Sequence, residues 1–273
     1  MMRKLLKHEF TATGRIMGIV YAVVALLMGY VLISYFSNRD EATVGQMLGI
    51  SVLMIISMCM FILTAVVMIT NFQKTLYGDQ GYLSFTLPVK SVSLLTSKVV
   101  VSTAWFVAAF ACMIGTIAIM MFVLKEDFLG DDYETLESIL PLFLGGKSVA
   151  TIVTYGLYRL ISLFVSFAMF TLEIYFAITI ANTRAFQKHY VLWTIVLSVA
   201  IIAVTSWISD LISDALRFGL AITENGVSIM TANTELAYDA LSLDLTSVIV
   251  TIIFGAVFYY GTFYLMSKKV NIR

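Results

Sequence analysis

Charged residues, proline, cysteine and histidine are all scarce in this chain of 273 residues, and each scarcity excludes a class of protein. Only 12% of the residues are charged, whereas soluble domains average roughly 25%. Seventeen Lys and Arg balance seventeen Asp and Glu, which argues against a nucleic-acid-binding protein because such proteins use excess positive charge. With only two prolines and sixteen glycines, the chain is neither fibrous nor disordered.

The few cysteines and histidines leave little for catalysis or metal binding. Cys59 and Cys112 fall inside long apolar stretches, where we expect them to be packing residues. The apolar stretches contain no pair of acids and no Ser–His pair, and the two histidines, His8 and His189, lie far apart in the sequence. We therefore predict no catalytic residues, no metal site, no cofactor in this chain, and no enzymatic activity.

Long hydrophobic runs dominate what is present, since 60% of the residues are hydrophobic. A helix needs about 20 mostly apolar residues to cross a membrane. Six stretches qualify, and none shows the alternating polarity of a β-barrel strand: Ile16–Phe36, Met47–Thr70, Val99–Leu124, Leu160–Ile180, Val191–Ile208 and Thr246–Met266. The sequence predicts an all-α polytopic membrane protein, with residues 1–273 forming one transmembrane domain.

The distribution of cations predicts the orientation of the chain. If the N-terminus is cytoplasmic, the cytoplasmic segments hold twelve Lys and Arg and the outer segments hold four. Cytoplasmic segments are the ones that retain Lys and Arg. We therefore expect both termini in the cytoplasm.

The first fifteen residues have an amphipathic pattern. On a helix, the apolar Met1, Met2, Leu5, Leu6 and Phe10 would share one side, and Arg3, Lys4, Lys7 and His8 the other. Such a helix lies in the membrane interface with its cations towards the headgroups, although a frayed basic tail is an alternative interpretation. The apolar run that follows is too long for a cleavable signal peptide.

The segment from residue 71 to 98 is the most informative cytoplasmic connection. Gly78, Asp79, Gln80 and Gly81 are turn-forming residues. The apolar side chains Tyr82, Leu83, Phe85 and Leu87 follow them, at a place that otherwise faces water. Physical chemistry alone leaves two interpretations open: the side chains pack on the membrane interface, or they form a docking surface for a partner protein.

Two of these stretches also carry a resemblance to a known family. The basic start MMRKLLKHEF, the six spans, and the letters LYGDQGYLSFTLP at residues 76–88 are similar to those of permease subunits of type-two ATP-binding-cassette exporters. The similarity is greatest to the permeases of Gram-positive bacteria. It covers the full length in layout, but its distinctive letters are confined to the start and to this loop.

The resemblance implies roles that the residues alone do not establish. Residues 1–15, with Lys4, Lys7 and Phe10, would form an elbow helix. Part of Gln73–Pro88 would be a coupling helix that docks on an ATPase subunit through Tyr77, Asp79, Tyr82, Leu83, Phe85 and Leu87. Residues 209–245 would hold re-entrant or extracellular gate elements. The chain would pair with an identical or related permease above two ATPase subunits, which bind ATP and Mg²⁺, in the bacterial plasma membrane.

Glu173 is the single ionisable residue well inside a predicted span. A charge at that depth costs about 2.5–3.5 kcal/mol on the insertion scale, which makes it a functional candidate. Tyr259 and Tyr260 are predicted at a similar depth and could hydrogen-bond it. Two interpretations stay open: a protonated carboxyl that ties helices together, or a contact for cargo or gating. We expect Arg159 to extend to the outer headgroups.

The chain has no room for an ATPase domain of its own. Its longest segment between spans, residues 209–245, has 37 residues, fewer than the roughly 50 that a domain needs. We expect a transport subunit that forms a substrate pathway and is coupled to a separate ATPase. Alternatives are a self-sufficient carrier or channel, and a non-transporting sensor or immunity protein. The sequence does not specify the cargo or the direction of transport.

Overall fold

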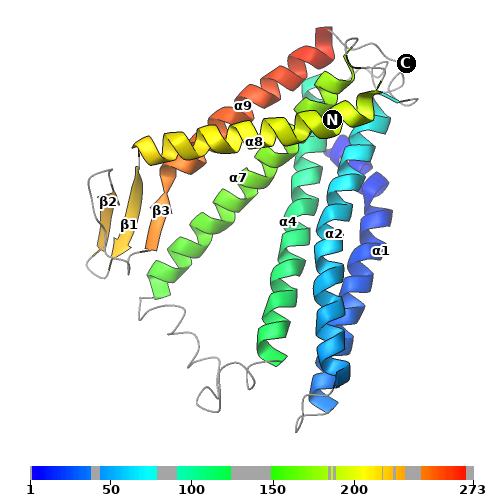
Figure 1. Ribbon diagram of the computed structural model, residues 1–273, viewed down its shortest axis with the longest axis vertical. Coiled ribbons are helices and arrows are strands. Elements are labelled where there is room, and N and C mark those ends of the chain that lie inside the picture. Colours follow the sequence, from blue (N-terminus) through cyan, green and yellow to red (C-terminus); the bar gives the residue numbers. More distant parts are fainter. Residues whose placement is uncertain are drawn as a thin grey trace. The chain divides into compact units, whose positions relative to one another are not determined.

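The computed structural model describes most of the helical part of the chain. The described residues are 2–37, 44–78, 91–123, 149–183, 186, 189–216, 218–223, 226–230 and 241–268. They form six long helices and three short strands (Figure 1). The helices are α1 (Met2–Ser37), α2 (Val44–Leu76), α4 (Ser91–Val123), α7 (Val149–Ala181), α8 (Tyr190–Leu216) and α9 (Leu245–Lys268).

All six helices are long and apolar enough to cross a membrane, which confirms the predicted number of candidate spans. Helices suit such sequences because lipid offers no hydrogen bonds, so each segment must satisfy its own backbone. The helices are longer than the predicted spans. Residues 71–76 belong to α2 and residues 91–98 to α4, so both ends of the connection predicted at residues 71–98 are helical.

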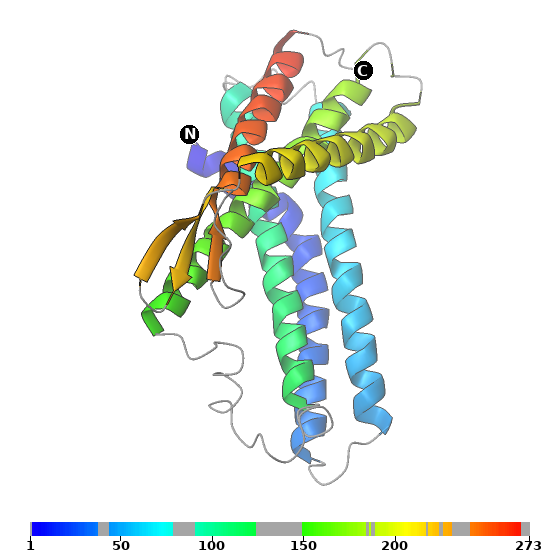
Figure 2. The ribbon, with the colours of Figure 1, turned by 60° about the vertical axis from the view of Figure 1, so that its left-hand side comes forward.

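The N-terminal residues are helical, but they are not a separate helix. α1 runs without interruption from Met2 to Ser37, and its first turns lie at an angle to the remainder (Figure 2). Thr11 and Thr13 donate to the backbone oxygens of Lys7 and Glu9, at 2.7 and 2.9 Å. Such hydroxyl bonds to the preceding turn often bend helices, which gives the bend a physical cause. Membrane orientation and an interfacial position of these turns stay predictions.

The chain divides into two compact units, which are described separately here. Unit 1 contains residues 1–71 and 104–139, and unit 2 contains residues 72–103 and 140–273, so α2 and α4 contribute to both. The core of unit 1 is built from α1, α2 and α4. Its buried side chains are aliphatic, with a tilted Phe61–Phe106 pair beside them: Val24, Val31, Ile50, Leu53, Met60 and Ala109.

Unit 2 is built around α7, which contacts both α8 and α9 (Figure 1). Met169 and Leu172 of α7 pack on Phe258 of α9. Two glycines of α9 allow this close approach. A Cβ at Gly255 would lie 3.7 Å from Met169 Sδ, and one at Gly261 would lie only 2.8 Å from Phe176 Cε2.

A small antiparallel sheet lies between α8 and α9 in the sequence, which the all-α prediction missed. Strands β1 (Gly219–Thr223), β2 (Gly226–Met230) and β3 (Leu241–Asp244) are arranged in the order β2-β1-β3. A Cβ at Gly219 would lie 2.6 Å from the Leu243 carbonyl oxygen, so this position needs glycine.

The described part of residues 209–245 contains the end of α8 and these strands, and the expectation of re-entrant or extracellular gate elements stays a prediction. α8 continues to Leu216, and the described residues after it are strands. The sequence did contain a signal for them: Asn225–Gly226 beside alternating apolar residues is a strong hairpin pattern.

Candidate functional site

A buried polar and aromatic cluster of unit 2 holds the end of α2 against α7. The rings of Phe72 and Tyr175 are stacked, with centroids 3.7 Å apart and planes 11° apart. The Tyr77 hydroxyl donates to Thr179 Oγ1 at 2.9 Å, and Thr179 in turn donates to the Tyr175 carbonyl at 2.7 Å. Ser102 of α4 shares a hydrogen bond with the Tyr175 hydroxyl at 2.5 Å. We call these five buried residues the aromatic clamp.

Burial determines the chemical state of Tyr77, which follows the last residue of α2. Burial raises the pKa of the Tyr77 phenol well above its usual range, and the hydrogen bond to Thr179 offsets this only in part. The phenol therefore stays protonated and serves as the donor in that bond. Tyr77 is the one predicted docking residue within the described part of the chain, and it faces α7 instead of a free surface.

The turn at the end of α2 begins where the sequence predicted it. The amides of Tyr77 and Gly78 both donate to the Gln73 carbonyl, at 2.9 and 3.0 Å. A Cβ at Gly78 would lie 3.0 Å from the Lys74 carbonyl oxygen, so glycine favours this tight ending. The other predicted docking residues lie outside the described residues: Asp79, Tyr82, Leu83, Phe85 and Leu87.

The start of α4, on the other side of residues 79–90, is held by α9. The Tyr259 hydroxyl shares a hydrogen bond with Thr96 Oγ1 at 2.8 Å and lies 3.3 Å from the Val92 carbonyl oxygen. Both helices that flank residues 79–90 are thus tied by hydrogen bonds to unit 2, one to α7 and the other to α9.

Glu173 is buried, as predicted, but its partner is on a different helix. Its side chain is 6% exposed, and its Oε1 accepts a 2.5 Å hydrogen bond from the Thr205 hydroxyl of α8. Tyr259 is bonded to α4, and Tyr260 is 66% exposed on the surface of α9. The expected hydrogen bond between these tyrosines and Glu173 is therefore wrong. The direction of each side chain depends on packing that the sequence does not show.

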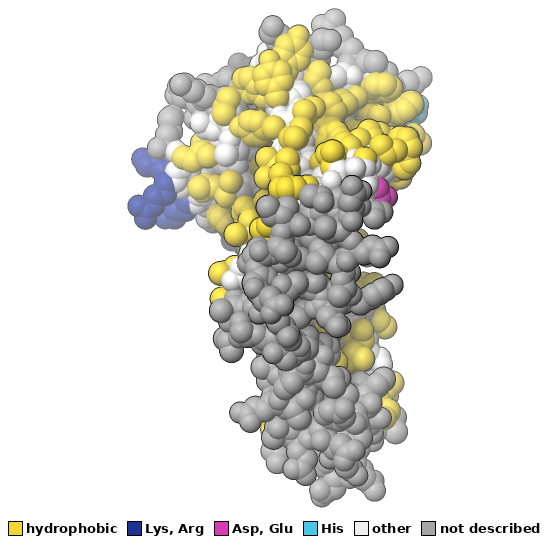
Figure 3. All heavy atoms as spheres, turned by 90° about the vertical axis from the view of Figure 1, so that its left-hand side faces the viewer, with side chains coloured by type: hydrophobic (Ala, Val, Ile, Leu, Met, Phe, Trp, Pro, Cys, Tyr) yellow, Lys and Arg dark blue, Asp and Glu magenta, His cyan; other side chains and the backbone are white. Residues whose placement is uncertain are grey.

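One of the predicted elbow residues, Phe10, contacts a tryptophan of unit 1. Lys4 and Lys7 are exposed, and Figure 3 shows Lys and Arg side chains gathered into one group. The Phe10 ring lies 6.0 Å from the Trp105 ring, and Trp105 Nε1 donates to Thr13 Oγ1 at 3.0 Å. These contacts fix the start of α1 to α4.

Two buried charged residues were not anticipated. Glu9 is buried in unit 1, where Asn71 Nδ2 donates to its Oε2 at 3.1 Å. Lys98 in α4 is only 2% exposed, although the sequence suggested a cytoplasmic cation. For Glu9 the sequence did contain a signal. Glu9 lies four residues after Leu5 and three after Leu6, so on a helix it is their neighbour on the apolar side.

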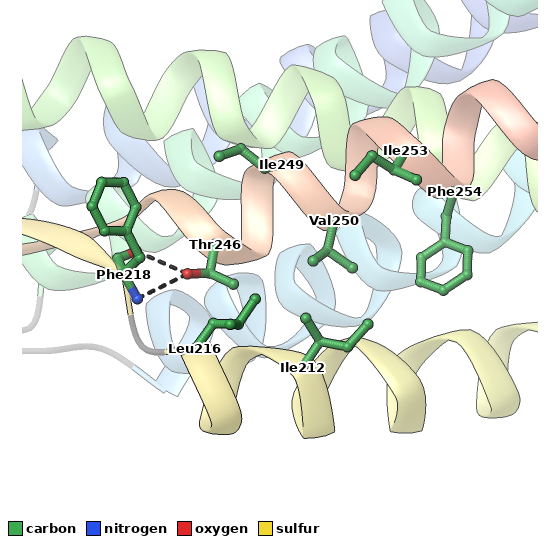
Figure 4. Close-up of a pocket in the computed structure, with 8 residues that line it drawn as sticks. All are labelled: Ile212, Leu216, Phe218, Thr246, Ile249, Val250, Ile253 and Phe254. Atoms are coloured by element: carbon green, nitrogen blue, oxygen red, sulfur yellow. Dashed lines mark hydrogen bonds between the residues drawn. The ribbon is translucent and has the colours of Figure 1, made fainter. Parts of the chain in front are cut away.

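An apolar groove separates the adjoining ends of α8 and α9, with a volume of about 580 Å³ (Figure 4). Ile212 and Leu216 of α8 face Val250 and Phe254 of α9 across it. At its end the Phe218 amide donates to Thr246 Oγ1 at 2.9 Å, and the Thr246 hydroxyl lies 2.9 Å from the Phe218 carbonyl. The groove offers hydrocarbon contact and very little polar chemistry.

Neither catalysis nor metal binding has a visible site among the described residues, where no group of three His, Cys, Asp or Glu comes together. No protein-family model, curated protein or solved structure matches the chain. The geometry shows that α2 and α4, which flank residues 79–90, are hydrogen-bonded to two other candidate membrane-spanning helices, α7 and α9.

Proposed function

We propose that this chain is the membrane-spanning permease subunit of an ATP-driven exporter in the bacterial plasma membrane. It works with separate ATPase subunits and a second permease, and residues 79–90 dock on the ATPase. The observation that carries the proposal is the aromatic clamp, supported by the hydrogen bond between Thr96 and Tyr259.

The clamp suits a loop that receives force. A solvent-exposed connection needs no buried partner for its flanking residues, because loops ordinarily run over the surface. Here Phe72 and Tyr77 are buried against α7 immediately before the loop. Packed interiors have low compressibility and transmit strain, so a displacement of the loop moves α7 with it.

Because residues 79–90 are anchored at both ends, their displacement would move two helices, α7 and α9. The end of α2 pulls on α7 through Tyr77 and Thr179, and the start of α4 pulls on α9 through Thr96 and Tyr259. Because α7 also contacts α8 through Glu173 and Thr205, movement reaches every helix of unit 2. This is the connection that a coupled permease requires between ATP hydrolysis and a substrate pathway.

Transport driven by ATP requires a partner protein that hydrolyses the nucleotide. The chain has no segment between spans that is long enough for a nucleotide-hydrolysing domain. The loop, with its apolar and aromatic side chains, is the segment best suited to contact a separate ATPase.

A pull-down from native membranes in mild detergent tests the proposal. We expect an ATPase subunit to co-purify with the tagged protein and to be lost from a variant carrying Tyr82→Ala, Leu83→Ala and Phe85→Ala. Partners are identified by mass spectrometry, and ATP hydrolysis by the eluate is measured alongside.

A matched control removes the same kinds of side chain from lipid-facing positions. Tyr260→Ala, Trp207→Ala and Leu211→Ala together affect residues that are all exposed on α8 and α9, and should leave the ATPase bound. A protein that purifies without any nucleotide-hydrolysing partner would contradict the proposal and favour a self-sufficient carrier. Equal loss of ATPase in both variants would contradict the assignment of the docking loop.

A further inference from the structure

A polar cavity of about 340 Å³ lies between the middle of α7 and the first turns of α9, within unit 2. Most of its lining is hydrophilic, which is unusual between two membrane-spanning helices. The polar groups that matter most are Arg159, Ser162, Ser166, Asp244, Ser247 and Thr251.

Helical spacing directs these groups towards one another. Ser162 and Ser166 are four residues apart on α7, and Ser247 and Thr251 are four apart on α9, so each pair lies on a single face of its helix. Polar groups at membrane depth are expensive and commonly mark sites of function. Two polar faces directed into one cavity therefore call for an occupant.

The hydroxyl groups that line the cavity can still accept hydrogen bonds from a ligand. Each hydroxyl donates its single hydrogen to a backbone carbonyl in the preceding turn: Ser162 to Arg159 at 3.0 Å, Ser166 to Ser162 at 2.9 Å, Ser247 to Asp244 at 3.2 Å, and Thr251 to Ser247 at 2.7 Å. A hydroxyl oxygen that has donated its hydrogen keeps lone pairs for an incoming donor. The cavity is thus rich in acceptors.

One charge of each sign completes the lining. Arg159 Nε donates to the Tyr155 hydroxyl at 2.8 Å, and its guanidinium carbon lies 5.0 Å above the Tyr155 ring. Among the described residues no carboxylate pairs with this guanidinium, so its terminal nitrogens keep donors for a ligand. Asp244 uses one oxygen to cap α9, accepting from the Ser247 amide at 3.2 Å, and its second oxygen remains for a cation.

We propose that this cavity binds a zwitterionic headgroup that joins a phosphate to a protonated primary amine, as in phosphatidylethanolamine. The guanidinium binds the phosphate through charge-assisted hydrogen bonds. The ammonium donates its three hydrogens to Asp244 and to the hydroxyl oxygens. A choline headgroup lacks the N–H donors, and a glycerol headgroup lacks the positive charge, so both fit less well.

The surroundings of the cavity indicate a lipid as the source of this headgroup. The apolar stretches of α7 and α9 begin at Val153 and Leu245, which puts Arg159 and Asp244 near the depth where headgroups meet hydrocarbon. The apolar Leu160, next to Arg159, is 64% exposed, as expected of a residue in contact with lipid. The inference depends on the helices spanning a membrane and is independent of the proposed ATPase partner.

Native mass spectrometry of the purified protein tests this site. The protein is offered phosphatidylethanolamine, phosphatidylcholine and phosphatidylglycerol with identical acyl chains, and the bound lipids are counted. We expect phosphatidylethanolamine to be retained preferentially, and Arg159→Gln to weaken its retention by about tenfold, as expected for the loss of hydrogen bonds to a charged group. Asp244→Asn can still cap α9 and should remove the preference for ethanolamine over choline while retaining phosphate binding.

Arg15→Gln, which alters an exposed arginine of α1, is the matched control and should retain lipid like the parent. Thermal unfolding of each variant excludes loss of fold as the cause, and Arg159→Lys should restore part of the binding. Equal retention of the three lipids by the parent, or unchanged retention by Arg159→Gln, would overturn the proposal. Competition by soluble phosphoethanolamine would support the chemistry of the site and assign it to a soluble ligand in place of a lipid.

Discussion

The last turns of α7 and its middle use polar residues in opposite ways. Near Ala181, the residues of the aromatic clamp are buried, and their hydroxyls bond to one another or to backbone. Around the middle of α7, the hydroxyls of Ser162 and Ser166 donate to backbone oxygens, and together with Arg159 they line the polar cavity. Tyr175 and Arg159 are sixteen residues apart, about 24 Å along the same helix. The difference teaches that polar residues in a span can either fasten helices together or hold a cavity open.

We expect the largest effect on stability from removing an aromatic ring of the clamp. Phe72→Ala removes a fully buried ring stacked on Tyr175. We expect a loss of about 3 kcal/mol in the free energy of unfolding, at the low end for buried aromatic truncations, because lipid tails are as apolar as the side chain. Reversible unfolding in mixed micelles measures it. Tyr260→Ala, at an exposed position of α9, is the control, and an equal loss there would show that the clamp contributes nothing special.

A smaller effect is expected from overfilling the packed side of α7. Gly261→Ala puts a Cβ 2.8 Å from Phe176 Cε2, so the ring must move. Overpacking of this kind costs about 1–3 kcal/mol. Gly156→Ala is the matched control, because its Cβ meets nothing within 4 Å, and it should be neutral or slightly stabilising. Similar unfolding free energies for the two variants would contradict the close approach of α7 and α9.

Sequence patterns predicted the spans well because their signal is simple. Length and hydrophobicity decide whether a helix can cross a membrane, and all six predicted helices are present. The small sheet was missed because a single Asn225–Gly226 pattern was outweighed by the long apolar runs. Helix ends such as that of α2 were placed too early, since Asn71 and Gln73 look like loop residues yet continue the helix.

The contents of the clamp and of the cavity could be predicted much less well. Helical periodicity shows which residues share a face, but not which helix that face meets. Tyr77 was predicted as a docking residue and is buried against Thr179. Arg159 and Glu173 were recognised as unusual, whereas their neighbours Ser162 and Thr205 carry no distinguishing signal in a chain rich in hydroxyl residues. Tertiary packing supplied that information.

The smallest effect concerns Glu173, which lies on α7 between the clamp and the cavity. Its hydrogen bond from Thr205 joins α7 to α8. Coupling energies between polar side chains in membrane proteins average about 0.6 kcal/mol and reach about 1.7 kcal/mol. We expect a value near the upper end for this buried pair, measured by a double-mutant cycle of Glu173→Ala and Thr205→Ala in reversible unfolding.

The variant Glu173→Gln distinguishes a structural role of Glu173, in joining α7 to α8, from a function that depends on its carboxyl group. Glutamine keeps the size of the side chain and an oxygen that accepts from Thr205, so the unfolding free energy should change little. If Glu173 only fastens α7 to α8, as the clamp fastens α2 to α7, this variant should also stimulate the co-purified ATPase like the parent. A stable variant whose ATPase stimulation is lost would show instead that the carboxyl acts in gating or cargo contact, and would place Glu173 with the functional polar residues of the cavity.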